Sequence, residues 1–315
     1  VACDMYKNRD IKMIRNNLFS REILTAPITR CIGFFIALLS VVIIDNRFGT
    51  LLLDPASIYP FMIMMAVPIS LGLKNQWNII SVTKRACIPI GIIVCAMNQV
   101  FFLSNVGTYE QTVFSARLMY SPLALGILLS FLLPIIESTK GIDCQPDRRN
   151  VYVAFISILL AFILSAKFLF EITPDIQGMS FTAFFNVTAA YVVMLVMGLC
   201  FIHPKLVFLN FVEKIYKSSL GIILVSAIFG VSTYVYATAT DMSLLGGTVA
   251  SAVLGIFYGA ILALFAIVAG GNYRESDQES MFFEWHMIES YAFYTLIVMP
   301  PLSIIEVLSE QGIFN

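Results

Sequence analysis

The sequence predicts an all-α, polytopic membrane protein with about eight transmembrane helices in two tandem four-helix halves. The composition is the first reason: 59% of the residues are hydrophobic and only 12% are charged, about half of the charged fraction of a soluble domain. The second reason is a series of apolar runs near the roughly 20 residues that cross a bilayer. The third is the distribution of positive charge, which alternates from loop to loop.

The eight expected spans are separated by short polar loops. In chain order they are Ile28–Ile44, Ile58–Leu73, Ala86–Ser104, Val113–Ile136, Tyr152–Phe170, Phe181–Ile202, Leu220–Tyr236 and Leu244–Val268. Residues 1–27 form a basic segment before them. Residues 271–315 form a cytoplasmic or interfacial tail, because the apolar run Tyr291–Ile305 is short for a span and contains Pro300 and Pro301.

Lys and Arg residues set the expected orientation. Of the 19 in the chain, 16 fall on residues 1–30 and on alternate loops, and the exceptions are Arg47, Arg117 and Lys167. Basic loops stay in the cytoplasm. We therefore expect both termini to be cytoplasmic, with an even number of spans between them.

Short matches at a nearly constant offset indicate an internal repeat. Gly91-Ile-Ile recurs as Gly221-Ile-Ile, Leu125-Gly126-Ile127 as Leu254-Gly255-Ile256, and Tyr59 as Tyr191, each 129 to 132 residues apart. The halves would cover residues 28–140 and 150–270. Because each contains an even number of spans, they would be parallel rather than inverted repeats.

The last expected span carries small residues at helical spacing. Ser251, Gly255 and Gly259 are four residues apart and share one helix face. Small side chains let two helices approach closely in lipid, where packing rather than hydrophobicity drives association. Gly255 and Gly259 are therefore candidate helix-packing residues.

The sequence lacks the patterns of an enzyme or a metal protein. Its six cysteines form no C-x-x-C pair, its two histidines, His203 and His286, are far apart, and no phosphate-binding or catalytic motif is present. No basic stripe favours nucleic acid. We expect no catalytic residue, no metal and no cofactor.

Polar residues inside the expected spans are the candidates for function, because each is costly there. No Asp or Glu lies in the middle of the eight spans. Ser226, Thr248 and Ser251 are candidates for an ion path, although hydroxyls in helices more often bond to their own backbone carbonyls. Asn98 and Gln99, in the third span, are candidates for a substrate site between the two halves.

The second half resembles a known family. The stretch Leu244–Phe265, with the run SAVLGIFYGAILALF, resembles the last membrane helix of the MotA/TolQ/ExbB family of ion-driven, stator-type motor subunits, and Gly221–Gly230 resembles its partner helix. Phe170–Gly198 and Arg47–Leu73 resemble the first helix pair, and His286–Leu308 the cytoplasmic tail. The loop Lys205–Ser219 is shorter than the family's cytoplasmic domain.

This resemblance implies a role and partners. The chain would be a multi-pass, homo-oligomeric subunit of an ion-gradient-driven motor or energy-transducing channel complex in the bacterial inner membrane. A single-pass membrane partner would supply an intramembrane Asp that binds H+ or Na+, which would explain why the eight spans hold no carboxylate. Several copies of this chain would surround that partner helix.

Two other functions remain open. A secondary transporter built from parallel repeats would place its site near Asn98 and Gln99, and a scaffold subunit would have no site at all. A stable oligomer around a foreign single-pass helix favours the motor subunit. A monomer with a substrate-dependent thermal shift favours the transporter.

The charge pattern predicts which loops are accessible from outside the cell. A single cysteine introduced at residues 104–109 should react with an impermeant maleimide in intact cells, whereas one at residues 141–150 should react only after lysis. Equal labelling of both loops would contradict the predicted topology.

Overall fold

The computed structural model describes most of the expected membrane region. The described residues are 54–74, 79–104, 120–136, 148–172, 181–203, 211–240, 245–270 and 283–295, with five single positions between residues 32 and 43. Almost all of them are helical, and none of them lies in a strand. The predicted all-α class is confirmed for this part of the chain.

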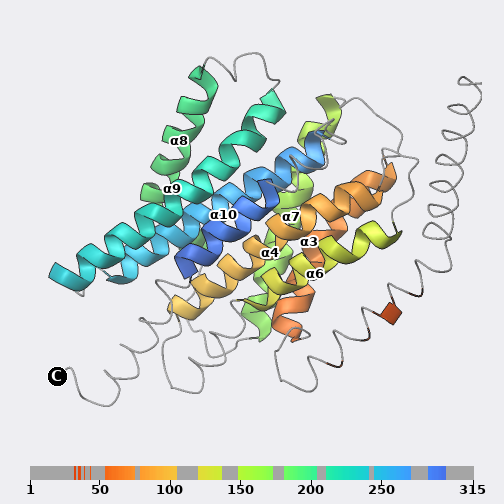
Figure 1. Cartoon of the computed structure of the whole chain (residues 1–315), viewed down its shortest axis with the longest axis horizontal. Helices are drawn as coiled ribbons and strands as arrows, with labels where there is room; N and C mark the ends of the chain where they lie inside the picture. The colour runs from red at the N-terminus through yellow and green to blue at the C-terminus, as the bar shows by residue number, and fades with distance from the viewer. Residues whose placement is uncertain are drawn as a thin grey trace, which may run out of the picture.

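Helices make up the fold shown in Figure 1. They are α3 (Pro55–Lys74), α4 (Ile79–Ser104), α6 (Ser121–Ile136), α7 (Arg148–Ile172), the 3₁₀ turn η1 (Phe181–Phe184), α8 (Val187–Ile202), α9 (Phe211–Thr240) and α10 (Leu245–Gly270). Residues 283–295 form a further helix, called the C-terminal helix below. In a bilayer, helices satisfy their own backbone hydrogen bonds, which is why long apolar segments adopt this form.

Six of the described helices are long and apolar enough to cross a membrane. These are Pro55–Leu73, Ile79–Val100, Val151–Glu171, Phe181–Ile202, Phe211–Ala237 and Val249–Gly270, and they coincide with the second, third, fifth, sixth, seventh and eighth expected spans. The chain is therefore an integral, polytopic helical membrane protein.

The other two expected spans are described only in part. Ser121–Leu133, in α6, is a shorter apolar helix that covers the second part of the expected fourth span. In the expected first span, the five described residues, Ile32, Phe35, Ile36, Leu39 and Ile43, are helical. The rest of that span, both termini and most connecting loops lie outside the described residues, so the count of eight spans and the location of the termini remain predictions.

The two halves of the chain have corresponding helix contacts. In the second half α9 and α10 form the most extensive pair, and in the first half α4 and α6 pack together in the same way. α3 lies against α4 as α8 lies against α9. The halves meet where α10 packs on α4 and α7 packs on α3, so each half contributes a different face to their interface.

The same helix crossing occurs once in each half. A Cβ on Gly126 would lie 2.5 Å from the carbonyl oxygen of Cys87, and one on Gly259 would lie 3.1 Å from that of Ser219. Cys87 and Ser219 are 132 residues apart, and the two glycines are 133 apart. The packing therefore pairs Gly126 with Gly259 and corrects the expected match with Gly255, which lies about one helical turn away.

One face of the C-terminal helix packs against the bundle, and the opposite face, with Trp285, Glu289 and Phe293, is exposed. The ring of Phe283 stacks on Tyr216, near the start of α9, with centroids 4.0 Å apart. At the other end, the Tyr294 hydroxyl donates to the carbonyl of Val249, near the start of α10, over 3.2 Å. Because consecutive helices α9 and α10 form a hairpin, their starts lie at opposite ends of the bundle. This helix therefore follows the bundle for about 20 Å.

This packing adds to what the sequence predicted for the tail. Residues 283–295 form a helix that packs on other helices along one face, and the cytoplasmic or interfacial location of residues 271–315 remains a prediction. Glu284, His286 and Glu289 interrupt the apolar run, so hydropathy placed its start too late, at Tyr291. Residues 271–282 and 296–315 lie outside the described part of the chain.

Close approach at the glycine crossings predicts a strong dependence on side-chain size. Gly126→Ala should lower the free energy of unfolding by about 1–3 kcal/mol, because the new methyl group would meet the rigid Cys87 backbone. Gly198→Ala, on α8, is the matched control: nothing lies within 4 Å of its added Cβ, so it should be neutral or slightly stabilising. Thermal unfolding in detergent measures both. Equal stability of the two variants would contradict the crossing.

Candidate functional site

The contacts of the C-terminal helix with α4 and α6 hold buried polar side chains. The Gln99 Nε2 atom, on α4, donates a hydrogen bond of 2.8 Å to the Tyr291 hydroxyl. Both side chains are fully buried. A hydrogen bond between groups that are 192 residues apart in sequence fixes the C-terminal helix at this position along α4.

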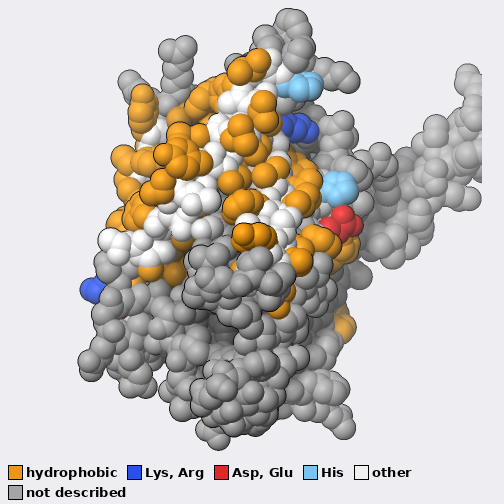
Figure 2. All heavy atoms as spheres, turned by 90° about the vertical axis from the view of Figure 1, so that its left-hand side faces the viewer, with side chains coloured by type: hydrophobic (Ala, Val, Ile, Leu, Met, Phe, Trp, Pro, Cys, Tyr) orange, Lys and Arg blue, Asp and Glu red, His pale blue; other side chains and the backbone are white. Residues whose placement is uncertain are grey.

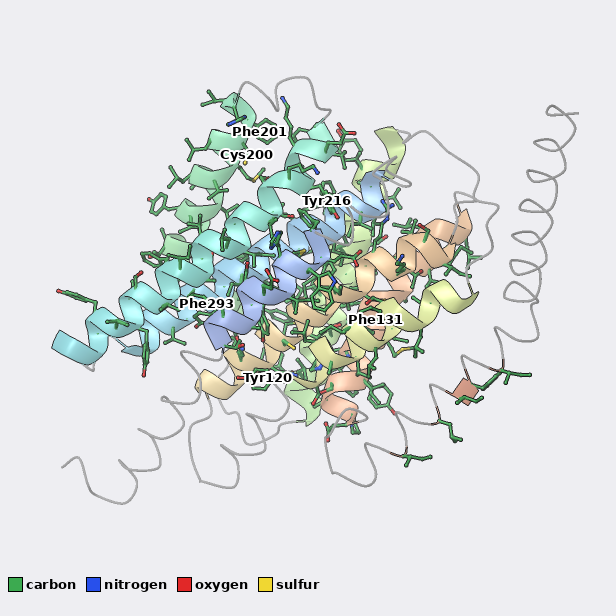
Figure 3. All side chains as sticks on the ribbon, viewed as in Figure 1. Tyr120, Phe131, Cys200, Phe201, Tyr216 and Phe293 are labelled. Atoms are coloured by element: carbon green, nitrogen blue, oxygen red, sulfur yellow. The ribbon has the colours of Figure 1, made fainter. Side chains whose placement is uncertain are left out.

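Three elements converge on this hydrogen bond. The Cys95 thiol, one turn before Gln99, accepts from the backbone N–H of Leu123 over 3.2 Å and also contacts Tyr291. The Tyr120 hydroxyl, at the start of α6, donates to the carbonyl of Thr295 over 3.4 Å. Figure 3 labels Tyr120 and Tyr216, which contact opposite ends of the C-terminal helix.

One acceptor in this polar cluster has no partner. Among the described residues, the Gln99 Oε1 atom accepts no hydrogen bond although it is buried. Leaving a buried acceptor unpaired costs about 1–3 kcal/mol. This oxygen is therefore an unsatisfied acceptor within the polar cluster.

The opposite end of the C-terminal helix carries a buried carboxylate. Glu284 is only 7% exposed. Its two sequence neighbours make aromatic contacts with other helices: Phe283 stacks on Tyr216, and the Trp285 ring lies 6.4 Å from the Phe131 ring of α6. Because Tyr216 precedes the seventh expected span, Glu284 lies near one end of the bundle, where a buried carboxylate is still costly unless it is paired.

The second carboxylate of the helix has a different environment. Glu289 is exposed, and its Oε2 atom lies 2.9 Å from the Nδ1 atom of His286. The two acids thus lie on one helix, five residues apart, with only Glu284 buried. This pair offers a matched comparison between a buried and an exposed acid.

The hydroxyls that the sequence indicated lie around the α9–α10 contact. Ser226 is 1% exposed, and its Oγ atom lies against Gly255 with no hydrogen-bond partner in the described region. Ser251 is also buried. The Thr248 side chain lies outside the described residues. Ser226 therefore fills a helix–helix contact, and the ion-path role of all three residues remains a prediction.

The expected packing glycines lie in this same contact. Gly255 faces Ser226, and a Cβ on Gly259 would come within 2.6 Å of the Ile223 side chain. Of the two amides proposed for a transporter site, Asn98 is 7% exposed and Gln99 is fully buried. The Gln99 side chain contacts the C-terminal helix through its hydrogen bond to Tyr291.

Sequence analysis missed Glu284, Tyr291 and Tyr294 as candidates. A usable signal was present: residues 283, 287, 290, 291 and 294 recur at helical spacing, and all are buried. That stripe would have predicted a packed helix with Glu284 beside its buried face. Hydropathy alone does not detect it, because the polar residues of the segment lower the average.

The described part of the chain contains no group of three or more His, Cys, Asp or Glu side chains that could hold a metal ion. Comparison with protein-family models, with curated proteins and with solved structures finds no match. The function must therefore be argued from the buried groups themselves.

The Gln99–Tyr291 hydrogen bond predicts a coupled mutational effect. Tyr291→Phe should destabilise the protein by about 1–3 kcal/mol, because it leaves the buried Gln99 amide without its acceptor. Adding Gln99→Leu should recover part of that loss, because no unpaired amide then remains. Tyr191→Phe, at an exposed position on α8, is the control and should change nothing. If the destabilisation of the double variant in thermal unfolding equals the sum of the two single-variant destabilisations, the Gln99–Tyr291 hydrogen bond is contradicted.

Proposed function

We propose that this chain is a multi-pass subunit of an ion-gradient-driven membrane complex, in which Glu284 takes up and releases the transported H+ or Na+. The observation that carries the proposal is a carboxylate that is 7% exposed on a helix that contacts both helix pairs, α4 and α6 in the first half and α9 and α10 in the second. A buried carboxylate can exchange water ligands for an ion and return them, which apolar side chains cannot do.

This proposal keeps the role implied by the MotA/TolQ/ExbB resemblance and changes one part of it. The resemblance implies that a single-pass partner brings the ion-binding Asp. The C-terminal helix offers a carboxylate from the same chain, packed against α4, α6, α9 and α10. A partner with an intramembrane Asp would then act in series with Glu284. Thr248 and Ser251 would face that partner, whereas Ser226 is buried in the α9–α10 contact.

Ion flux tests the role of Glu284. The purified chain, alone and with its co-purifying membrane partners, is reconstituted into liposomes with a pH or sodium gradient. Glu284→Gln keeps the shape but removes the charge, so we expect flux to fall by about tenfold or more. Glu289→Gln is the matched control, because it removes the exposed acid of the same helix and should leave flux intact.

The results of the flux experiment test the role of Glu284 and the ion-conducting function separately. Unchanged flux in Glu284→Gln would remove this residue from the ion path. Absence of flux from the wild-type chain, both alone and with its partners, would refute an ion-conducting function. Thermal unfolding of both variants distinguishes a lost ion site from a lost fold.

A secondary transporter is the second candidate, and the unpaired Gln99 Oε1 atom favours it. A buried acceptor beside Tyr291 and Cys95 could hold a donor group of a small polar substrate at the junction of α4, α6 and the C-terminal helix. Flux that survives Glu284→Gln but is lost in Gln99→Leu would support this function instead.

A further inference from the structure

The C-terminal helix runs parallel to α9, from one end of the bundle toward the other. Near its start, Phe283 stacks on Tyr216, which precedes the seventh expected span. Near its end, the Tyr294 ring lies against Gly230, where an added Cβ would come within 2.6 Å of that ring. On α9, Tyr216 and Gly230 are about 21 Å apart along the helix axis. The C-terminal helix therefore extends through most of the depth that α9 crosses.

Contacts with the first half give the C-terminal helix the same direction. In its last part, Tyr291 and Thr295 accept hydrogen bonds from side chains at the end of α4 and at the start of α6. In its first turn, Trp285 contacts Phe131, which lies near the end of α6. An amphipathic helix in the plane of the membrane surface would cross the bundle axis instead of following it.

α9 serves as a depth scale because it is long and apolar enough to cross a bilayer. Its apolar part runs from Phe211 to Ala237. α8 and α9 lie at the left of Figure 1, and this side faces the viewer in Figure 2, where hydrophobic side chains cover much of the described surface. Such a surface matches the hydrocarbon core of a membrane. A residue that lies level with the middle of α9 is therefore inside the membrane.

The charged residues of the C-terminal helix all lie in its first two turns. They are Glu284, His286 and Glu289, and the last two form an exposed pair. Glu289 lies about 9 Å along the axis from the start of the helix, level with the first turn of the expected seventh span. Trp285 is exposed at the same end, and tryptophan is enriched at membrane–water interfaces. From Ser290 to Met299 the sequence has no charged residue.

We propose that the C-terminal helix is a further transmembrane helix, which carries the residues after Pro301 to the membrane side opposite residues 271–282. The apolar residues 296–299 would complete the crossing with about 6 Å of helix, and Pro300 and Pro301 would end it. The distribution of positive charge agrees with this orientation. Arg274 precedes the helix, and no Lys or Arg follows Arg274 in the chain.

This crossing changes the topology that hydropathy predicts. Added to the eight expected spans, it makes the number of crossings odd and places the residues after Pro301 outside the cell. The inference goes beyond the proposed ion flux and does not depend on it. Within the proposed function, Glu284 would meet the transported ion from the side of residues 271–282, because it lies in the first turn of the helix.

Accessibility of two serine positions tests the crossing. Ser276→Cys and Ser309→Cys are made separately in the full chain, and intact cells are treated with an impermeant maleimide. We expect labelling of Ser309→Cys in intact cells and of Ser276→Cys only after lysis, each above the labelling of the wild-type chain. Labelling of both positions from the same side would overturn the proposal, because an interfacial helix or a re-entrant segment returns the chain to the side on which it began.

Tryptophan fluorescence in liposomes with brominated lipids measures the depth of the helix. Trp77→Phe leaves Trp285 as the only tryptophan of the chain. Adding Trp285→Phe and Phe293→Trp moves the fluorophore about 12 Å along the helix. We expect strongest quenching by lipids brominated near the headgroup in the first variant and near the bilayer centre in the second. Equal depths in the two variants would overturn the crossing, whatever the result of the flux experiment.

Discussion

Close backbone approach at two glycines is the constraint on which the rest of this structure depends. Lipid tails are as apolar as the helices, so burying hydrophobic surface does not hold the bundle together. Gly126 and Gly259 let α6 and α10 lie directly on the carbonyls of Cys87 and Ser219. Those two crossings set the register of each helix pair, and the pairs in turn shape the space that the C-terminal helix occupies.

The polar residues of the protein fall into two groups, those that bond within their own helix and those that bond to another segment. Many hydroxyls bond to their own helices: Ser218, Ser219, Ser232 and Thr233 all donate to backbone carbonyls three or four residues earlier. Such groups are satisfied locally. Other side chains join distant segments: Tyr258 and Ser165 bond to backbone atoms of other helices or turns, and Gln99, Tyr120, Tyr291 and Tyr294 make such bonds at the C-terminal helix.

The two halves resemble one another in packing and differ in what surrounds them. Each contains a helix pair crossed at a glycine, and each has an outer helix on that pair. In the first half, the face formed by α3 and α4 is covered within the chain: α10 packs on α4, and α7 packs on α3. Among the described helices, none covers α9 in the way that α10 covers α4.

The sequence by itself determined the all-α class and the positions of most membrane helices, because hydropathy is a local property summed over about 20 residues. It also indicated the repeat and the packing glycines. Tertiary structure alone decided that Gly126 corresponds to Gly259, that Ser226 fills a helix contact, and that Glu284 lies inside the bundle. These depend on contacts between segments that are far apart in the chain, such as Gln99 with Tyr291, and no local average of side-chain properties contains them.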